Sequence, residues 1–262
     1  MVCSILIVHS CINPGYYFRA MKKWGLLLLL IFLSAWAGIY LWIPGELDLS
    51  VAGMVNCTEN GAYRRLTEET CWEKWWPQAK PVNQPYCGTD RHPFIYESYS
   101  YRLTGVFSKG IEVAIQQGDF SFDTRILILP RANPDTIFLE WRGHLAGNSL
   151  NPFERIRQYR RVKVIREGMA GILASLCSFL EKKENIYGFG IRELRSADNT
   201  KLLMAEVCGG DWTVSQAIGQ LQLFIKDYRM ESVAPSFETL VTDRSKEPDT
   251  TKWVTRIYFP VL

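Results

Sequence analysis

An uncharged run of apolar and small residues extends from Trp24 to Ile43. At a rise of about 1.5 Å per residue, a helix of this length spans the roughly 30 Å hydrocarbon core of a bilayer. Basic residues precede the run and acidic residues follow it: Arg19, Lys22, Lys23, Glu46 and Asp48. The pattern predicts a single-pass transmembrane helix, with the N-terminus in the cytoplasm and the remainder of the chain on the outer (periplasmic) side.

The same run has a second interpretation as a cleaved signal peptide. Ala35-Trp36-Ala37 matches a small-x-small cleavage site after a leucine-rich core. We favour an anchor over residues 24–43, because residues 38–43 stay apolar beyond that site. Residues 1–23 are then a cytoplasmic segment, which a natural start at Met21 would shorten.

Residues 46–145 alternate apolar and polar positions in short runs, as strands with one buried face do. Leu47, Leu49 and Val51 begin this pattern. A polar, helix-permissive stretch and a proline-rich connection follow. Further extended runs are Phe94–Val106, Ile111–Gln116, Asp119–Leu129 and Thr136–Leu145. The connections between them are short turns with glycine or proline, which predicts antiparallel neighbours.

A long amphipathic helix is expected after these strands. Asn151 is a suitable N-cap, Pro152 fits the first helical position, and Glu154 lies near the positive end of the helix dipole. Apolar residues recur at helical spacing: Phe153, Ile156, Tyr159, Ile165, Met169, Ile172, Leu173, Leu176 and Leu180. The first half is also basic: Arg155, Arg157, Arg160, Arg161, Lys163 and Arg166. This basic half is either a solvated face or a contact with anionic lipid headgroups.

One strand, short helices, an antiparallel sheet and a closing helix form a helix-grip pattern over residues 46–184. With the motif Trp72-x-x-Trp75-Trp76-Pro77 after the first strand, this region resembles the SRPBCC (START-like, polyketide cyclase-like) superfamily. The resemblance implies a curved sheet that folds around the long helix and leaves an apolar cavity.

Two interpretations apply to the apolar residues of this region. Trp72, Trp75 and Trp76 either line the entrance to a ligand cavity or form a packing plug that seats the short helices on the sheet. Met169 and Leu173 are likewise either cavity wall or filled core. The packing interpretation is the safer one for both groups.

Residues 201–262 have the pattern strand, helix, strand, strand. An apolar run at Leu202–Val207 leads into a helix whose apolar positions share one face: Val214, Ala217, Ile218, Leu221, Phe224, Ile225 and Tyr228. Thr213 matches the first position of a capping box. Residues 236–242 and 252–261 are the two further strands.

Parts of this unit carry a second resemblance: Met204 to Gly210, Val241 to Arg244, Glu247 to Thr250, and Trp253 to Val261. They resemble the GyrI-like, or AraC-type effector-binding, family, which builds its ligand cleft from two βαββ modules. Residues 186–262 hold one complete copy, preceded by an extra strand at Tyr187–Ser196. A second chain in a homodimer or a neighbouring domain completes the cleft, or the effector-binding role is lost.

Glu206 is the candidate ligand residue of this module. Buried against Trp253 or Tyr258, its carboxylate could bind a cationic ligand, the role that the resemblance implies for acidic residues of GyrI-like drug-binding relatives. The alternative is an outward-facing strand residue in a salt bridge.

Composition and motifs exclude several function classes. The chain is 47% hydrophobic and 22% charged, and a net charge of +3 is too small to indicate a nucleic-acid partner. A nucleophile elbow, a phosphate loop and a zinc-protease motif are missing, so we predict no catalytic set, cofactor or metal. Cys57, Cys71 and Cys87 could form one disulfide, whereas Cys177 and Cys208 fit small buried thiols.

These patterns predict an α+β protein with a helix-grip sheet, a βαββ module and an N-terminal anchor. The leading hypothesis is a membrane-anchored, extracytoplasmic protein that binds a small apolar or cationic molecule. One alternative is a hydrolase or cyclase-type enzyme that uses Glu206 as a general acid or base in a hydrophobic cleft. The other is a structural module that dimerises through the βαββ unit.

Overall fold

The computed structural model describes residues 14–77, 93–146, 151–195 and 201–262. They belong to two compact units, one within Met1–Leu47 and Ala146–Arg161 and the other within Asp48–Leu145 and Val162–Leu262. The fold is α+β, with a six-stranded and a separate four-stranded antiparallel sheet. This confirms the predicted class.

Helix α1 (Pro14–Trp42) contains the predicted apolar run. Its segment Trp24–Trp42 is long and apolar enough to cross a membrane, and its leucines are exposed. A membrane anchor and a signal sequence both have these properties. The helix is therefore confirmed, and its role as an anchor stays a prediction.

The six-stranded sheet has the order β1-β6-β5-β4-β3-β2. Its strands are β1 (Glu46–Val55), β2 (Phe94–Tyr96), β3 (Tyr99–Phe107), β4 (Gly110–Gln117), β5 (Phe120–Pro130) and β6 (Ile137–Ala146). Neighbours from β2 to β6 pair antiparallel, and those from β3 to β6 are joined by the expected short turns. The predicted run Phe94–Val106 divides into two strands, because Glu97 adopts a left-handed conformation with φ 55° and turns the chain.

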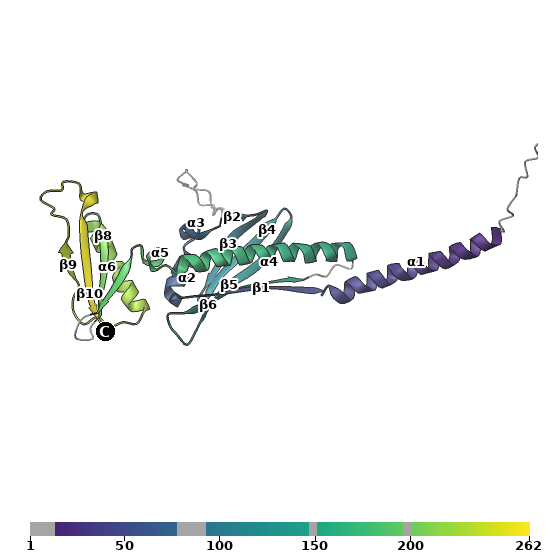
Figure 1. The fold of residues 1–262 in the computed structure, drawn as a ribbon, viewed down its shortest axis with the longest axis horizontal. Coiled ribbons are helices and arrows are strands. Elements are labelled where there is room, and N and C mark those ends of the chain that lie inside the picture. Colours follow the sequence, from purple (N-terminus) through teal and green to yellow (C-terminus); the bar gives the residue numbers. More distant parts are fainter. Residues whose placement is uncertain (1–13, 78–92, 147–150, 196–200) are drawn as a thin grey trace, which may run out of the picture. The chain divides into compact units, whose positions relative to one another are not determined.

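Short helices and one long helix accompany this sheet. They are α2 (Glu59–Thr67), a 3-10 turn (Glu69–Cys71), α3 (Trp72–Trp75) and α4 (Pro152–Leu180). The Asn151 side chain accepts a hydrogen bond from the Phe153 amide at 3.0 Å, which confirms the predicted cap. From Val162 onward, α4 lies along one face of the sheet in a helix-grip-like arrangement (Figure 1).

The apolar stripe of α4 is shorter than its periodicity predicts. Ile165, Met169 and Leu176 are fully buried, but the Phe153 residue is 73% exposed and Tyr159 is 48% exposed. These two aromatic residues belong to the predicted stripe by spacing, but they lie on the exposed part of the helix. Helical spacing identifies a face of the helix, but it does not show how much of its length is covered.

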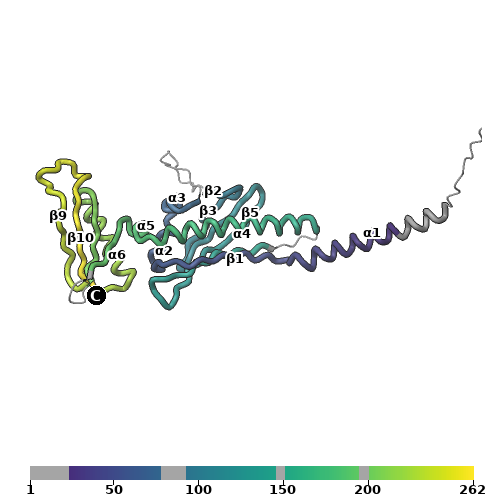
Figure 2. Tube along the Cα trace, in the orientation of Figure 1, coloured from purple at the N-terminus to yellow at the C-terminus, as the bar shows by residue number. Residues whose placement is uncertain are grey.

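The four-stranded sheet has the order β7-β8-β10-β9. Its elements are α5 (Lys183–Tyr187), β7 (Ile191–Arg195), β8 (Lys201–Cys208), α6 (Asp211–Asp227), β9 (Phe237–Leu240), a 3-10 turn (Thr250–Lys252) and β10 (Val254–Val261). Helix α6 lies against one face of the sheet, and β9 and β10 run side by side (Figures 1 and 2). From β8 onward this order confirms the predicted βαββ unit.

Three local predictions in this unit need correction. Gly210, not Thr213, is the N-cap of α6, so the helix begins three residues earlier than a capping box would place it. The extra strand predicted from Tyr187 begins at Ile191, because Lys183–Tyr187 forms a helical turn that ends at Gly188 with φ 89°. Strand β9 is also shorter than the predicted 236–242.

Asp227 links the two sheets within the second unit. Its side chain is 4% exposed, forms an ion pair with Arg64 of α2, and accepts a hydrogen bond from the Tyr187 hydroxyl at 3.0 Å. Burial, followed by the nearby Asp227 charge, raises the pKa of Tyr187. Arg65 also donates to the Ile186 carbonyl. These contacts hold α2, α6 and the segment before β7 together.

The described cysteines are free thiols. Cys57 and Cys71 are buried and unbridged, so a disulfide that includes either of them was a wrong expectation; Cys87 lies outside the described residues. Cys208 is exposed rather than buried, because it belongs to the sheet face opposite α6.

Candidate functional site

The end of β8 has a partner strand on one side only among the described residues. Strand β7 pairs with Lys201–Ala205 and its pairing stops at Ile191, whereas β10 pairs with all of β8 up to Cys208. Glu206–Cys208 therefore forms an open sheet edge. Such an edge exposes backbone groups and leaves room beside the strand.

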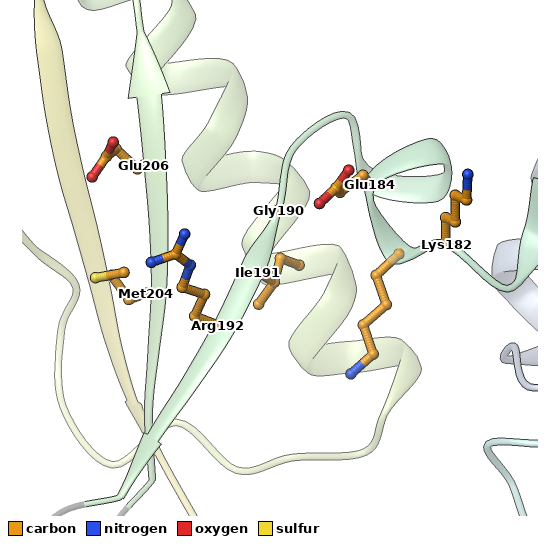
Figure 3. A pocket seen from close by; sticks show the side chains of 8 residues that line it. Lys182, Glu184, Gly190, Ile191, Arg192, Met204 and Glu206 are labelled. Carbon is orange, nitrogen blue, oxygen red and sulfur yellow. The ribbon is translucent and has the colours of Figure 1, made fainter.

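A hollow of about 560 Å³ lies over this edge and the start of β7. Figure 3 shows Glu206 and Met204 of β8 beside Arg192 of β7, with Glu184 and Lys182 contributed by the α5 region. Met204 is buried, and three basic residues against two acidic ones line the hollow. The lining consists of Lys182, Lys183, Glu184, Gly190, Ile191, Arg192, Met204 and Glu206.

A second hollow, of about 680 Å³, also reaches Glu206. One wall is a flank of α6 with Gln216, Gln220 and Leu223, and another includes Arg65 of α2. Tyr187, Gly188 and Phe189 extend that wall, and Cys208 lies at the strand edge. Helix α2, which accompanies the six-stranded sheet, therefore lines part of a hollow in the βαββ unit.

Glu206 connects the two hollows, but it is not buried against an aromatic ring. It is exposed, and its Oε2 atom accepts a hydrogen bond from Nε of Arg256 at 2.8 Å. The carboxylate raises the pKa of the Arg256 guanidinium. The expectation of burial was wrong because Leu203, Ala205 and Val207 take the covered face, so alternation turns Glu206 outward. Glu206 is thus an outward-facing strand residue in a salt bridge, as the alternative interpretation predicted.

Trp253 and Tyr258 interact with other partners than Glu206. Arg244 lies over the Trp253 ring, 4.5 Å from its centroid, and the indole N–H donates to the Glu247 carbonyl at 2.8 Å. The Tyr258 ring stacks on Phe237 with centroids 5.0 Å apart. Tyr258 does share the outward sheet face with Glu206, since it pairs with Met204 two residues away. Trp253 precedes β10.

Trp72, Trp75 and Trp76 form one aromatic cluster. The Trp72 and Trp76 rings stack at 5.7 Å, and Trp75 lies within 5.6 Å of both. All three residues are at least 95% buried, and the Trp72 indole donates to the Leu66 carbonyl at 2.9 Å. Tyr101 packs edge-on against Trp76. These contacts favour the packing interpretation, and ligand binding by the cluster stays a prediction.

Met169 and Leu173 of α4 are equally enclosed. Met169 is fully buried and Leu173 is 2% exposed. Nearby, the Ser175 hydroxyl donates to the Trp75 carbonyl, which ties α4 to α3. A ligand at these residues would have to displace packed side chains, because protein interiors leave few voids of molecular size.

The second hollow includes residues that the sequence interpretation missed. Gln216, Gln220 and Leu223 recur at helical spacing and define a second flank of α6, beside the apolar stripe. That spacing was a usable signal. No sequence pattern indicates that Arg65 lines this hollow, because its place there depends on how α2 packs against the βαββ unit.

No protein-family model matches the chain. No curated protein matches it either.

Solved structures give distant matches. A START superfamily protein from Mycobacterium smegmatis matches with a TM-score of 0.31 and 14% identity, over 49% of this chain and 98% of that chain. Structural genomics targets from Nitrosospira multiformis and Nitrosomonas europaea match with TM-scores of 0.36 and 0.34 at 13% and 16% identity. Each match covers 53% of this chain. It covers 99% of the Nitrosospira multiformis chain and 96% of the Nitrosomonas europaea chain. The small sheet β7–β10 has no assigned relative.

Proposed function

We propose that the chain is a membrane-anchored, extracytoplasmic protein that binds a small apolar or cationic molecule beside Glu206. The observation that carries this proposal is the pair of hollows, of about 560 and 680 Å³, that share this residue at the open end of β8. Small-molecule sites have volumes of about 300–1,000 Å³ and combine apolar walls with a few polar groups.

The Glu206–Arg256 pair does not block such a site. Both side chains are nearly half exposed, at 48% and 43%. An exposed ion pair contributes about 0–1 kcal/mol, so a ligand cation can replace Arg256 at small cost. Met204 and Leu223 are apolar residues in the linings of the two hollows that Glu206 shares. An organic cation with apolar groups matches this combination.

In this proposal the β7–β10 sheet and α6 are a single GyrI-like module. Its second hollow is completed from the same chain, by Arg65 and by the segment Tyr187–Phe189. The neighbouring domain thus takes the place of a second βαββ copy. A homodimer through the module is not required for this site.

A screen tests the binding proposal directly. The full chain, reconstituted in nanodiscs of phosphatidylcholine, is heated with hydrophobic cations and with neutral apolar compounds. A ligand that binds only the native state raises the melting temperature, and above Kd the rise grows with the logarithm of the ligand concentration. Unchanged melting with every compound of both classes contradicts the proposal.

A matched pair of variants tests the role of Glu206. Tetraphenylphosphonium is the cationic probe, and tetraphenylborate is an anion of the same shape. We expect the cation to bind and Glu206→Gln to weaken its affinity about tenfold, which corresponds to about 1.4 kcal/mol. Glu238→Gln removes an exposed charge from β9 and should leave affinity unchanged. Equal affinity of both variants, or preference for the borate, would remove Glu206 from the site.

A further inference from the structure

The first ten residues of α4 have an unusual surface for the start of a long helix. Phe153 and Tyr159 are large and exposed, at 73% and 48%. Four arginines accompany one glutamate: Arg155, Arg157, Arg160, Arg161 and Glu154. Phe153, Arg157 and Arg160 follow i, i+4, i+7 spacing and therefore share one helical face. Exposed aromatic and basic residues together are typical of helices at membrane interfaces.

Arg155 connects this part of α4 to the end of the apolar helix α1. Its Nε atom donates a hydrogen bond to the Ile43 carbonyl at 2.8 Å. Its guanidinium also lies 4.8 Å from the centroid of the Tyr40 ring. All three residues belong to the first compact unit. The first turn of α4 is therefore located where the apolar segment ends.

The end of α1 has the features of a membrane–water boundary. Leu41 and Trp42 are 83% and 89% exposed, and tryptophan and tyrosine are enriched at the headgroup level of bilayers. Phe153 and the arginines of α4 are held beside this boundary by Arg155. The aromatic ring suits the edge of the hydrocarbon core, and the guanidinium groups suit the polar headgroup layer that meets it there.

We propose that the face formed by Phe153, Arg157 and Arg160 docks on the phosphate groups of anionic lipids in the membrane that holds α1. The inference rests on the proposed role of α1 as an anchor. Arginine guanidinium groups bind phosphate oxygens through paired hydrogen bonds, and the Phe153 ring enters the interfacial layer. The ion pair of Arg157 with Glu154, at 3.2 Å, is exposed and exchanges readily for a phosphate.

A bilayer is a better match for this face than an acidic protein. The hydrogen bond of Arg155 to Ile43 keeps α4 next to lipid whenever α1 is inserted. Headgroups are then present at a high effective concentration, whereas a soluble partner must be recruited from dilute solution. Phe153 adds an apolar contact that a lipid interface accepts at any position.

Hydrogen exchange of the full chain in nanodiscs tests the proposal. One preparation contains phosphatidylcholine alone, and in the other a third of the lipid is phosphatidylglycerol. At low salt, we expect the amides of residues 153–161 to exchange at least about three times more slowly in the anionic nanodiscs than in phosphatidylcholine alone. The reason is that docking suppresses opening of the helix end. High salt should remove the difference.

Two charge-matched double variants make the test specific. Arg157→Gln with Arg160→Gln should abolish the lipid dependence. Arg102→Gln with Lys109→Gln, at exposed positions of β3 and of the turn between β3 and β4, should retain it. Unchanged exchange in β4 shows that each variant is folded. Equal exchange in both lipids overturns the lipid contact and leaves the face to a protein partner. A chain that does not stay with the nanodisc overturns the anchor as well.

Discussion

Cys57 and Cys208 place the same chemical group in opposite surroundings. Cys57 is fully buried, its thiol donates to the Thr58 carbonyl at 3.3 Å, and burial raises its pKa to about 12. Burial also raises the pKa of Cys177 to about 11. Cys208 is exposed at the edge of the second hollow. Thiolate character and access together decide cysteine reactivity.

We therefore expect N-ethylmaleimide to modify Cys208 rapidly at pH 8 and Cys57 most slowly of the described cysteines. A thiol with a pKa of about 12 is ionised in only about one molecule in ten thousand at pH 8. Peptide mass spectrometry of the full chain at successive times measures each rate. In denaturing urea Cys57 should react like Cys208. Equal rates in the native protein would contradict the burial of Cys57.

Residue patterns placed Glu206 on a strand of the βαββ unit, but they fixed neither its sheet face nor its partners. In the structure, alternation along β8 and β10 together with their pairing register puts Glu206 and Tyr258 on a common face. Alternation alone does not reveal that α6 covers the opposite face, so exposure was misjudged. The Arg244–Trp253 contact is set by the path of a polar loop, and loop paths have no period from which they can be inferred.

Strand β4 begins where two backbones approach closely. A Cβ atom at Gly110 would lie 2.0 Å from the Ile126 carbonyl oxygen of β5. The neighbouring Lys109 carbonyl accepts a hydrogen bond from the Ile128 amide at 2.8 Å, which fixes this approach. Gly219 in α6 is different, because a Cβ atom there meets nothing within 4 Å. The two glycines thus have different structural roles in their elements.

Alanine at these two positions should shift stability in opposite directions. Gly110→Ala forces β4 and β5 apart and should lower the free energy of unfolding by about 2–4 kcal/mol. Gly219→Ala should raise it by about 0.5–1 kcal/mol, since alanine favours helix more than glycine does. Urea denaturation of both variants in the full chain measures the changes. A stable Gly110→Ala variant would contradict the close approach of the strands.

Element order could be predicted because hydrophobic periodicity is local. The hairpins from β3 to β6, the helix α4 and the βαββ unit follow directly from it. Boundaries were less accurate where tertiary contacts decide them. Strand β7 begins late because residues 183–187 form a helical turn that contacts α2 and α6 through Tyr187 and Asp227. The exposed Phe153 shows the same limit, since periodicity does not report the extent of a covering sheet.

Two sets of basic residues lie near the ends of one apolar helix. Arg19, Lys22 and Lys23 precede the helix and predict that the N-terminus is cytoplasmic. The arginines at the start of α4 are more than 100 residues further along the chain. The positive-inside bias is counted over short segments next to a span, so these arginines do not oppose the predicted orientation. The face with Arg157 and Arg160 can therefore contact lipid on the outer side.

Retention of α1 in the mature protein separates an anchor from a signal peptide. We expect a chain expressed in bacteria to stay in the membrane after alkaline washing, with an intact mass that includes Trp24–Trp42, because this apolar segment can span the bilayer. A signal peptide cleaved after Ala37 would instead release a soluble chain that begins at Gly38. Ala37→Leu is the matched control, since a bulky residue blocks cleavage but leaves a span intact. If this substitution moved the chain from the soluble to the membrane fraction, α1 would be a signal peptide, and both the anchor and the lipid contact of α4 would be excluded.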